Sequence, residues 1–148
     1  MIKRYGERVD PAMHYTPRPG AYVILQRGHD LLLTVQDGTR LEHPEIQLPG
    51  GGIDAGEQIL PALHREVMEE TGFEVRAENL VGINSVTRDN SVEAFQSIQI
   101  IYHAQIIGGK LRFEEQGTTD MLEWHSLASV ADLQVVGMVR AALAMLPA

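Results

Sequence analysis

The segment REVMEETGF, residues 65–73, gathers three glutamates, Glu66, Glu69 and Glu70, within five positions. Side chains three and four residues apart are neighbours on a helix, and like charges at those spacings repel by about 0.2–0.5 kcal/mol per pair. Such a cluster is either a solvated acidic face or a site at which a cation lies between the carboxylates. The position of the glutamates relative to the buried side of the helix separates these two interpretations.

The glutamates border the apolar side of this predicted helix. With Ile59 as the origin and about 100° per residue, all three fall within roughly a third of the circumference, next to the aliphatic Leu63 and Val67. A helix that needed acids only for solubility would carry them opposite its core. Hard cations such as Mg²⁺ and Mn²⁺ take carboxylate oxygens together with water and substrate phosphates. The arrangement therefore suits a metal site, and from this segment alone the solvated acidic face stays open as the alternative.

A run of glycines precedes the helix. Gly50, Gly51 and Gly52 form a predicted loop, and glycine lets a backbone approach a ligand closely and turn a carbonyl group toward it. From Gly51 to Phe73 the chain reads G-x5-E-x7-R-E-V-x-E-E-x-G-F. At every specified position this pattern resembles the Nudix box, which is the signature of the Nudix hydrolase family.

The resemblance implies a fold and a chemistry. Nudix proteins have an α/β (α+β) fold, an α/β/α sandwich with a mixed sheet, in which the box forms a loop–helix–loop that holds divalent cations. They mostly hydrolyse a nucleoside diphosphate linked to another group X, by attack of water on phosphorus, with Mg²⁺ or Mn²⁺ as the cofactor. Metal ions stabilise charge on phosphate oxygens and lower the pKa of bound water. The resemblance thus implies a pyrophosphohydrolase.

The box also implies roles for individual positions. The implied catalytic and metal-binding residues are Arg65, Glu66, Glu69, Glu70, Glu57 and the carbonyl groups of Gly50 and Gly51. Glu57 would support the metal shell or the loop, although a first-turn acid is also favoured by the helix dipole alone. Arg65 would orient Glu66 by hydrogen bonding, or would serve only as the i,i+4 partner of Glu69.

Outside the box, the candidates are weaker. The general base is either a box glutamate or a glutamate from a loop, and the loop candidates are Glu93, Glu114 and Glu115. Arg27, at the end of the first predicted strand, and Arg88 are candidates for binding substrate phosphate, against the alternative of ordinary surface arginines.

The remaining motifs are weak. Trp124 is expected in the core rather than as a stacking platform for a base. The six histidines share no metal-ligand spacing. The glycines at 50 and 52 formally fit a dinucleotide fingerprint, but without its strand–turn–helix context.

Composition narrows the class of partner. The chain has 148 residues and a formal net charge of -8, which disfavours duplex nucleic acid as a ligand and leaves room for a small anionic nucleotide if a metal supplies positive charge. It has no cysteine, and neither a signal peptide nor a membrane-spanning apolar segment is recognisable. We expect a cytoplasmic protein with a small-molecule substrate and no membrane partner, and a homodimer is left open.

The pattern of apolar residues predicts the elements that position the box. Residues 1–148 are expected to form a single domain, with 1–19 as an irregular lead-in because of its three prolines. A helix is expected over 58–71, ended by Gly72 in a left-handed conformation. Strands are expected in 21–28, 30–37, 73–77, 80–90, 97–107, 110–115 and 121–127, and a second helix in 131–146. Residues 46–52 are expected to be a short strand broken by Pro49 and the three glycines. The first two strands should form a hairpin.

Three functional hypotheses compete. The first is a metal-dependent Nudix pyrophosphohydrolase acting on a nucleoside triphosphate or related nucleotide, with ADP-sugars, dinucleoside polyphosphates and capped RNA ends as alternative substrates. The second is a Nudix-like nucleotide-binding or regulatory domain without catalysis, which the intact set of carboxylates disfavours. The third is an isomerase of isoprenoid diphosphates, whose known relatives need a catalytic cysteine that this chain lacks.

Overall fold

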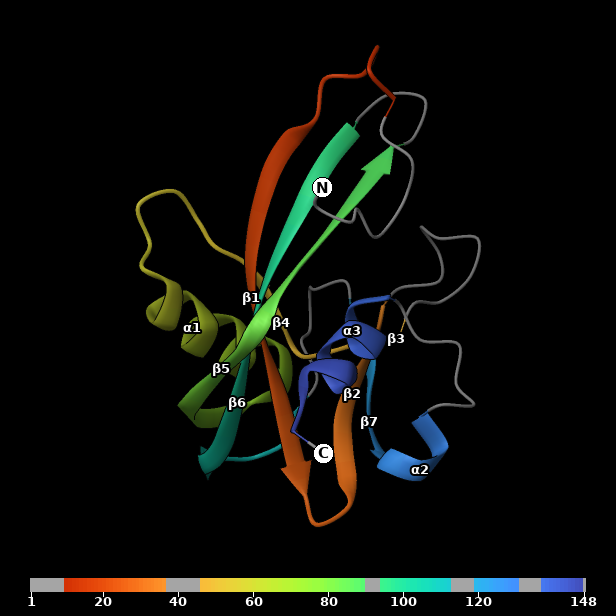
Figure 1. Ribbon diagram of the computed structural model, residues 1–148. Helices are drawn as coiled ribbons and strands as arrows, with labels where there is room; N and C mark the ends of the chain where they lie inside the picture. Colours follow the sequence, from red (N-terminus) through yellow and green to blue (C-terminus); the bar gives the residue numbers. More distant parts are fainter. Residues whose placement is uncertain (1–9, 37–45, 90–93, 113–118, 131–136, 148) are drawn as a thin grey trace.

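The computed structural model describes residues 10–36, 46–89, 94–112, 119–130 and 137–147 (Figure 1). Its elements in chain order are β1 Thr16–Arg27, β2 Asp30–Gln36, β3 Ile46–Gln47, β4 Gly50–Gly52, α1 Ile59–Thr71, β5 Phe73–Asp89, β6 Ala94–Gly109, β7 Thr119–Ser126, α2 Leu127–Val130 and α3 Gly137–Met145. The expected helix over the acidic cluster, the first hairpin and the strand before the last helix are confirmed.

Strand β1 is the central strand of a mixed sheet. Among the described residues the sheet has seven strands in the order β3-β2-β1-β6-β5, with β4 paired to β1 and β7 paired to β2. The first part of β1 runs parallel to β6 and antiparallel to β4, and its last residues turn into β2 through Gly28. One strand therefore joins the glycine segment to both halves of the sheet.

Two apolar clusters lie on opposite faces of this sheet, because side chains alternate along each strand. The cluster under α1 consists of Ala21, Val23, Leu25, Leu32, Leu63, Val67, Val75, Ala104 and Leu122. The cluster under α2 and α3 consists of Ile24, Leu31, Leu33, Leu48, Ile101, Val130, Met138, Val139 and Ala142. Figure 1 shows α1 on one side of the sheet and α3 on the other. The expected α/β/α sandwich is confirmed.

Strand β1 begins earlier than we expected. The lead-in was predicted to be irregular through residue 19, but β1 starts at Thr16 and includes Pro17 and Pro19. Every second residue of a strand points its backbone N and C=O toward the same neighbouring strand, so Pro17 and Pro19 share a side. The Pro19 carbonyl accepts a hydrogen bond from the Ile53 N–H, which is on the side of β4. Both prolines therefore face the edge beyond β4 rather than β6. A missing donor on that edge breaks no ladder bond.

The glycine segment also differs from the prediction. Gly50, Gly51 and Gly52 form strand β4 against β1 instead of a loop. Gly50 has φ +138°, and a Cβ there would collide with the Ala21 carbonyl oxygen and the Tyr22 backbone. Only a glycine permits this close approach of β4 to β1. Residues 110–112, expected in a strand, have no regular structure, and the rest of that segment lies outside the described residues.

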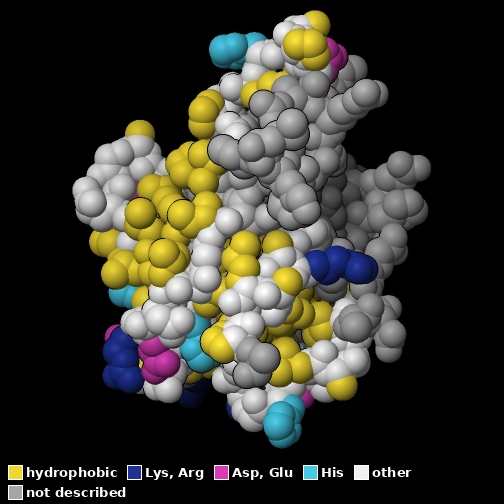
Figure 2. All heavy atoms as spheres, in the orientation of Figure 1, with side chains coloured by type: hydrophobic (Ala, Val, Ile, Leu, Met, Phe, Trp, Pro, Cys, Tyr) yellow, Lys and Arg dark blue, Asp and Glu magenta, His cyan; other side chains and the backbone are white. Residues whose placement is uncertain are grey.

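The outer surface carries several aliphatic side chains. Figure 2 shows hydrophobic side chains gathered on the left of the view, the side on which α1 lies in Figure 1. The most exposed large hydrophobic side chains among the described residues are Leu80 and Ile83 of β5. No helix in the described part of the chain has the length and apolar character needed to cross a membrane.

Helix α1 ends as expected, and this end gives the first testable prediction. Gly72 has φ +80° and its N–H donates to the Met68 carbonyl oxygen at 2.9 Å. A Cβ at Gly72 would collide with the Lys110 carbonyl oxygen, whereas Gly28, with φ +62°, has nothing within 4 Å of its Cβ position. Gly28→Ala should cost only the strain of a left-handed residue, about 1–2 kcal/mol.

We expect Gly72→Ala to lower the free energy of unfolding by at least about 1 kcal/mol more than Gly28→Ala, because a backbone collision adds to the strain. Urea unfolding of the two variants and the wild type measures both terms. Equal losses in the two variants would contradict the close packing of this helix end.

Candidate active site

Helix α1 carries the acidic cluster at the edge of its buried side. Leu63 and Val67 are buried against the sheet, and the glutamates next to them are buried to different degrees. Glu70 is 6% exposed, whereas the side chains of Glu66 and Glu69 are 21% and 49% exposed. The wheel argument is therefore confirmed: the carboxylates lie between the core and the solvent.

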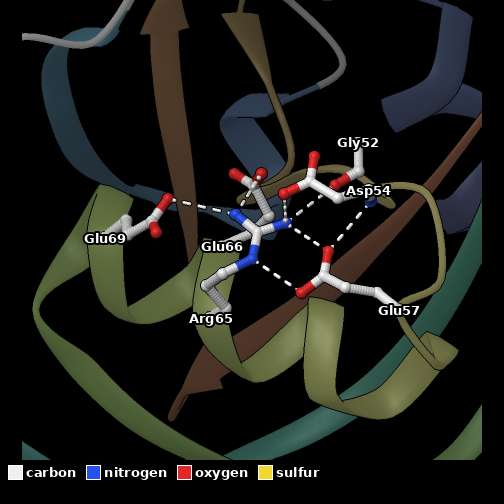
Figure 3. A network of polar contacts seen from close by, with 6 residues as sticks. All are labelled: Gly52, Asp54, Glu57, Arg65, Glu66 and Glu69. Carbon is white, nitrogen blue, oxygen red and sulfur yellow. Dashed lines mark hydrogen bonds and ion pairs between the residues drawn. The ribbon is translucent and has the colours of Figure 1, made fainter.

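The cation between the glutamates is Arg65 of the same helix (Figure 3). Its Nη1 donates to Glu66 Oε1 at 2.9 Å and to Glu69 Oε2 at 3.2 Å. Its Nε and Nη2 donate to the two carboxylate oxygens of Glu57 at 2.8 and 2.6 Å. The planar guanidinium, with five donors in a fixed fork, is suited to hold several carboxylates at once.

The same guanidinium ties the helix to the preceding strand and loop. Arg65 Nη2 donates to the Gly52 carbonyl oxygen at 3.2 Å and lies 3.4 Å from Asp54 Oδ2. Glu57 Oε1 in turn accepts the Asp54 N–H at 2.9 Å. The loop between β4 and α1 is thus fixed at both ends, and Glu57 is part of this support.

Hydrogen bonding changes the acidity of the two central groups. The Arg65 guanidinium, together with the Asp54 N–H, lowers the pKa of Glu57 from 4.5 to about 2. The hydrogen bonds from Arg65 to Glu57 raise the pKa of Arg65 above its usual value. The Arg65–Glu57 pair therefore stays ionised throughout the neutral and mildly acidic range.

Strand β4 places backbone carbonyl groups beside the glutamates. A Cβ at Gly51 would collide with the Glu66 carboxylate, so the glycine leaves room for this side chain against the strand. The Gly51 carbonyl oxygen lies near β1, 3.0 Å from where a Cβ of Gly20 would be. The Gly52 carbonyl accepts from Arg65. The Pro49 carbonyl accepts from Val23 N–H and the Pro19 carbonyl from Ile53 N–H, so by alternation the Gly51 carbonyl faces β1, whereas the Gly50 carbonyl faces away from β1, as that of Gly52 does.

The donor set suits a hard divalent cation. Carboxylate and carbonyl oxygens are the ligands that Mg²⁺ and Mn²⁺ prefer, and Gly51 provides space beside Glu66 that a side chain would fill. Within the described residues, no three acidic or histidine side chains are grouped closely enough to hold an ion by themselves. A cation here would be completed by backbone carbonyl groups, water and substrate oxygens, which is the usual state of protein-bound Mg²⁺.

A cavity of about 460 Å³ opens on the other face of β1, the face of α3. Its wall is formed by Arg18, Pro19, Gly20, Tyr22, Gln47, Gly52, Val86, Phe95, Ser97, Gln99, Gly137 and Met138. The Arg18 guanidinium lies over the Phe95 ring, 4.1 Å from its centroid. Cavities of this volume are typical of small-molecule sites. Gly52 belongs both to this wall and to the contacts of Arg65, so the cavity and the carboxylates meet at β4.

The other candidate residues lie elsewhere. Arg27 stacks on the Trp124 ring at 4.2 Å, at the end of β1 that turns into β2. It is five positions beyond Tyr22, which pairs with Gly50, a separation of about 16 Å along an extended strand. Trp124 packs against the cluster under α1, as expected for a core residue. Arg88 belongs to β5, and its side chain is not among those described.

The loop glutamates proposed as a general base, Glu93, Glu114 and Glu115, lie outside the described residues.

Sequence reasoning missed the cavity residues Arg18, Phe95 and Gln99. Arg18 and Phe95 are far apart in the sequence, and only the parallel pairing of β1 with β6 brings them together. The available signal was weak: polar residues interrupt the apolar run of β6 at alternate positions.

A family model described as the NUDIX domain matches residues 16–143. The chain belongs to the Nudix family. The box residues and the cavity next to β4 lie within the matched region, as does the sandwich except for the last two residues of α3.

Two relatives of this Nudix domain have proposed or assigned substrates. A Bacillus subtilis protein provisionally named 8-oxo-dGTP diphosphatase is 31% identical over 107 residues, which is 72% of this chain and 65% of that protein. An ADP-ribose pyrophosphatase of Methanocaldococcus jannaschii is 36% identical over 66 residues, or 44% of this chain and 37% of that protein. The matched segments thus span less than two thirds of either relative.

The fold is also found in solved structures. A Nudix hydrolase from Nitrosomonas europaea superposes with a TM-score of 0.75 over 88% of each chain, at 20% identity. At this identity the similarity establishes the fold of the sandwich alone.

The lowered pKa of Glu57 leads to a prediction about stability. A carboxylate with a depressed pKa stabilises the folded state above its unfolded pKa, and this contribution is lost as the pH falls through the folded pKa. We expect the stability difference between the wild type and Glu57→Gln to be constant above pH 4.5 and to shrink as the pH falls toward about 2. Urea unfolding at a series of pH values measures it.

The control is Glu74→Gln, which removes one negative charge from an exposed position of β5. About one proton is taken up when the Arg65–Glu57 pair is lost at low pH. A difference in the free energy of unfolding between the wild type and Glu57→Gln that stays the same from pH 6 to pH 2.5 would therefore contradict this pair.

Proposed function

We propose that this protein is a metal-dependent pyrophosphohydrolase. Its substrate would be a nucleoside diphosphate linked to a group X, with a nucleoside triphosphate as the favoured case. The observation that supports this most directly is the position of Gly52, which lines the cavity and also accepts a hydrogen bond from the arginine that holds the glutamates. A nucleoside bound in the cavity would carry its phosphates past β4 toward α1.

The metal would be held by the glutamates of α1 and one carbonyl group of β4. In the proposal the ligands are Glu66, Glu69 and Glu70, with the carbonyl oxygen of Gly50 in preference to that of Gly51. Bound Mg²⁺ or Mn²⁺ would supply the positive charge that stabilises the phosphate oxygens and lowers the pKa of a water nucleophile. With a net charge of -8, the protein needs such a cation to accept an anionic substrate.

The other residues of the proposed site hold the metal ligands, the loop and the base in position. Arg65 keeps Glu66 and Glu69 at fixed distances, and Glu57 keeps the guanidinium in place by two hydrogen bonds. When an added cation takes over part of the charge of Glu66 and Glu69, the pair of Arg65 with Glu57 still holds the loop. Phe95 offers an aromatic wall on which a base can stack, which is worth about 1–3 kcal/mol in known sites.

The substrate is the least restricted part of the proposal. The Bacillus subtilis relative is named for 8-oxo-dGTP, which agrees with our preference for nucleoside triphosphates, including damaged ones. The archaeal relative is named for ADP-ribose, but its match covers only 44% of this chain. A regulatory domain that binds nucleotides without catalysis is the alternative, and it would bind the same ligands without turnover. The cytoplasmic location expected from the sequence remains a prediction.

A substitution in the box tests the metal assignment. We expect Glu69→Gln to lower kcat at least about 100-fold, because a neutral amide is a poor ligand of a hard cation. Its side chain is the most exposed of the three, so the fold should be kept. The assay is a panel of nucleoside triphosphates and nucleoside diphosphate derivatives with Mg²⁺ or Mn²⁺, with products identified by mass.

Glu74→Gln serves as the matched control, since it removes an exposed carboxylate at the start of β5 that is not one of the box glutamates. Substantial Mg²⁺-dependent hydrolysis by Glu69→Gln would contradict the metal site. Tight binding of one nucleotide with no turnover by the wild type across the panel would favour the regulatory alternative.

A further inference from the structure

The cavity contains one buried polar side chain, that of Gln99. Among the described residues the buried polar or charged residues are Thr34, Glu70, Thr71 and Gln99, and of these only Gln99 lines the cavity. It is 7% exposed and comes from the middle of β6. A carboxamide buried in the wall of a cavity is costly unless it has hydrogen-bond partners, so its orientation carries information about the ligand.

Asn84 sets this orientation. Asn84 lies opposite Gln99 in the antiparallel pairing of β5 with β6, and its Nδ2 donates to Gln99 Oε1 at 2.8 Å. Asn84 does not line the cavity. Since the carbonyl oxygen of Gln99 is held from β5, the group that this side chain offers to a ligand is its Nε2 amide, a donor.

The charged group in the same wall is also a donor. Arg18 lies on β1, the strand next to β6, and its guanidinium stacks over the Phe95 ring. A guanidinium has no acceptor atom. Tyr22, Gln47 and Ser97 of the same wall can donate or accept, so the two groups of fixed character, Arg18 and the Nε2 of Gln99, are both donors. A ring with an exocyclic carbonyl group accepts hydrogen bonds from them, whereas an exocyclic amino group would bring a second donor against Gln99.

We propose that Gln99, oriented by Asn84, makes the cavity selective for a base with an exocyclic ring carbonyl, a 6-oxopurine, over a 6-aminopurine. This rests on the proposed function only in placing the nucleoside in the cavity. A site built to donate to a carbonyl discriminates strongly against a ligand that cannot accept, because a buried polar group is then left unpaired. The cavity of about 460 Å³ accommodates a purine.

The test is equilibrium binding of three nucleoside monophosphates, IMP, GMP and AMP, by calorimetry at pH 8 in the presence of a chelator. No metal or turnover is needed, so failure of hydrolysis does not affect the result. We expect the wild type to bind IMP and GMP about tenfold more tightly than AMP. IMP is the sharper comparison, because it lacks the 2-amino group of GMP.

Two variants change the hydrogen-bonding pattern in opposite places. Gln99→Glu replaces the donor by an acceptor. In Asn84→Asp the new carboxylate can only accept, so Gln99 should turn its Nε2 toward position 84 and its carbonyl oxygen toward the ligand. Both should lose or reverse the preference for IMP over AMP. The effect of Asn84→Asp is diagnostic, because this residue acts only through the orientation of Gln99.

Matched controls lie on the same strands. Gln96→Glu places the same charge on β6 at an exposed position, and Asn79→Asp does so on β5. Both controls should keep the wild-type ratio. Gln99→Met, which removes both polar groups without adding charge, should bring the ratio of the two dissociation constants near one, and urea unfolding confirms that each variant is folded.

Equal binding of IMP and AMP by the wild type would overturn the proposal, as would no binding of any monophosphate. A preference that survives in both Gln99→Glu and Asn84→Asp would also overturn it. Selective binding of IMP without hydrolysis of any triphosphate would support this inference and refute the proposed catalytic function.

Discussion

The structure of the site depends on one guanidinium. Arg65 contacts four carboxylates and a backbone carbonyl group, and these belong to the helix, the loop before it and strand β4. Without this fork, the charges of Glu66 and Glu69, three positions apart on the helix, would repel each other. Because the guanidinium is planar and permanently charged, it sets the directions of its partners as well as their charge balance. A lysine could supply the charge but not the geometry.

The same contact explains why the glycines are needed. Arg65 reaches Gly52 only because β4 lies close to both α1 and β1, and side chains at Gly50 and Gly51 would separate them. The glycines thus serve close packing of a strand, where their weak strand propensity costs some stability. In return, β4 presents carbonyl groups between the glutamates on one side and the cavity on the other.

Strand β1 provides the second constraint. Its alternating side chains belong to different layers: Val23 packs under α1, whereas Ile24 packs under α3. A ligand in the cavity and a cation at the glutamates would therefore lie on opposite sides of the same strand, and β4 is the edge at which they meet. In the proposed function the pyrophosphate chemistry would take place near the box, and the geometry of β4 would connect it to the cavity wall.

Much of this protein could be predicted from local patterns. The box helix, its end at Gly72 and the hairpin at Gly28 follow from the periodicity of apolar residues and from backbone conformations that only glycine adopts readily. The position of the glutamates beside the core also followed from helical geometry. These features involve residues close in the sequence, so their physical causes are visible there.

The tertiary structure alone decided the rest. The two prolines of β1 are tolerated because they face an edge that, among the described strands, has no partner beyond β4, and no local rule indicates which edge that is. Arg18 and Phe95 meet through a parallel pairing of distant strands, and Asn84 meets Gln99 through the register of β5 with β6. The sequence by itself determined that a helix with glutamates beside its buried side follows the glycines; only long-range strand pairing decided which side chains form the cavity beside it.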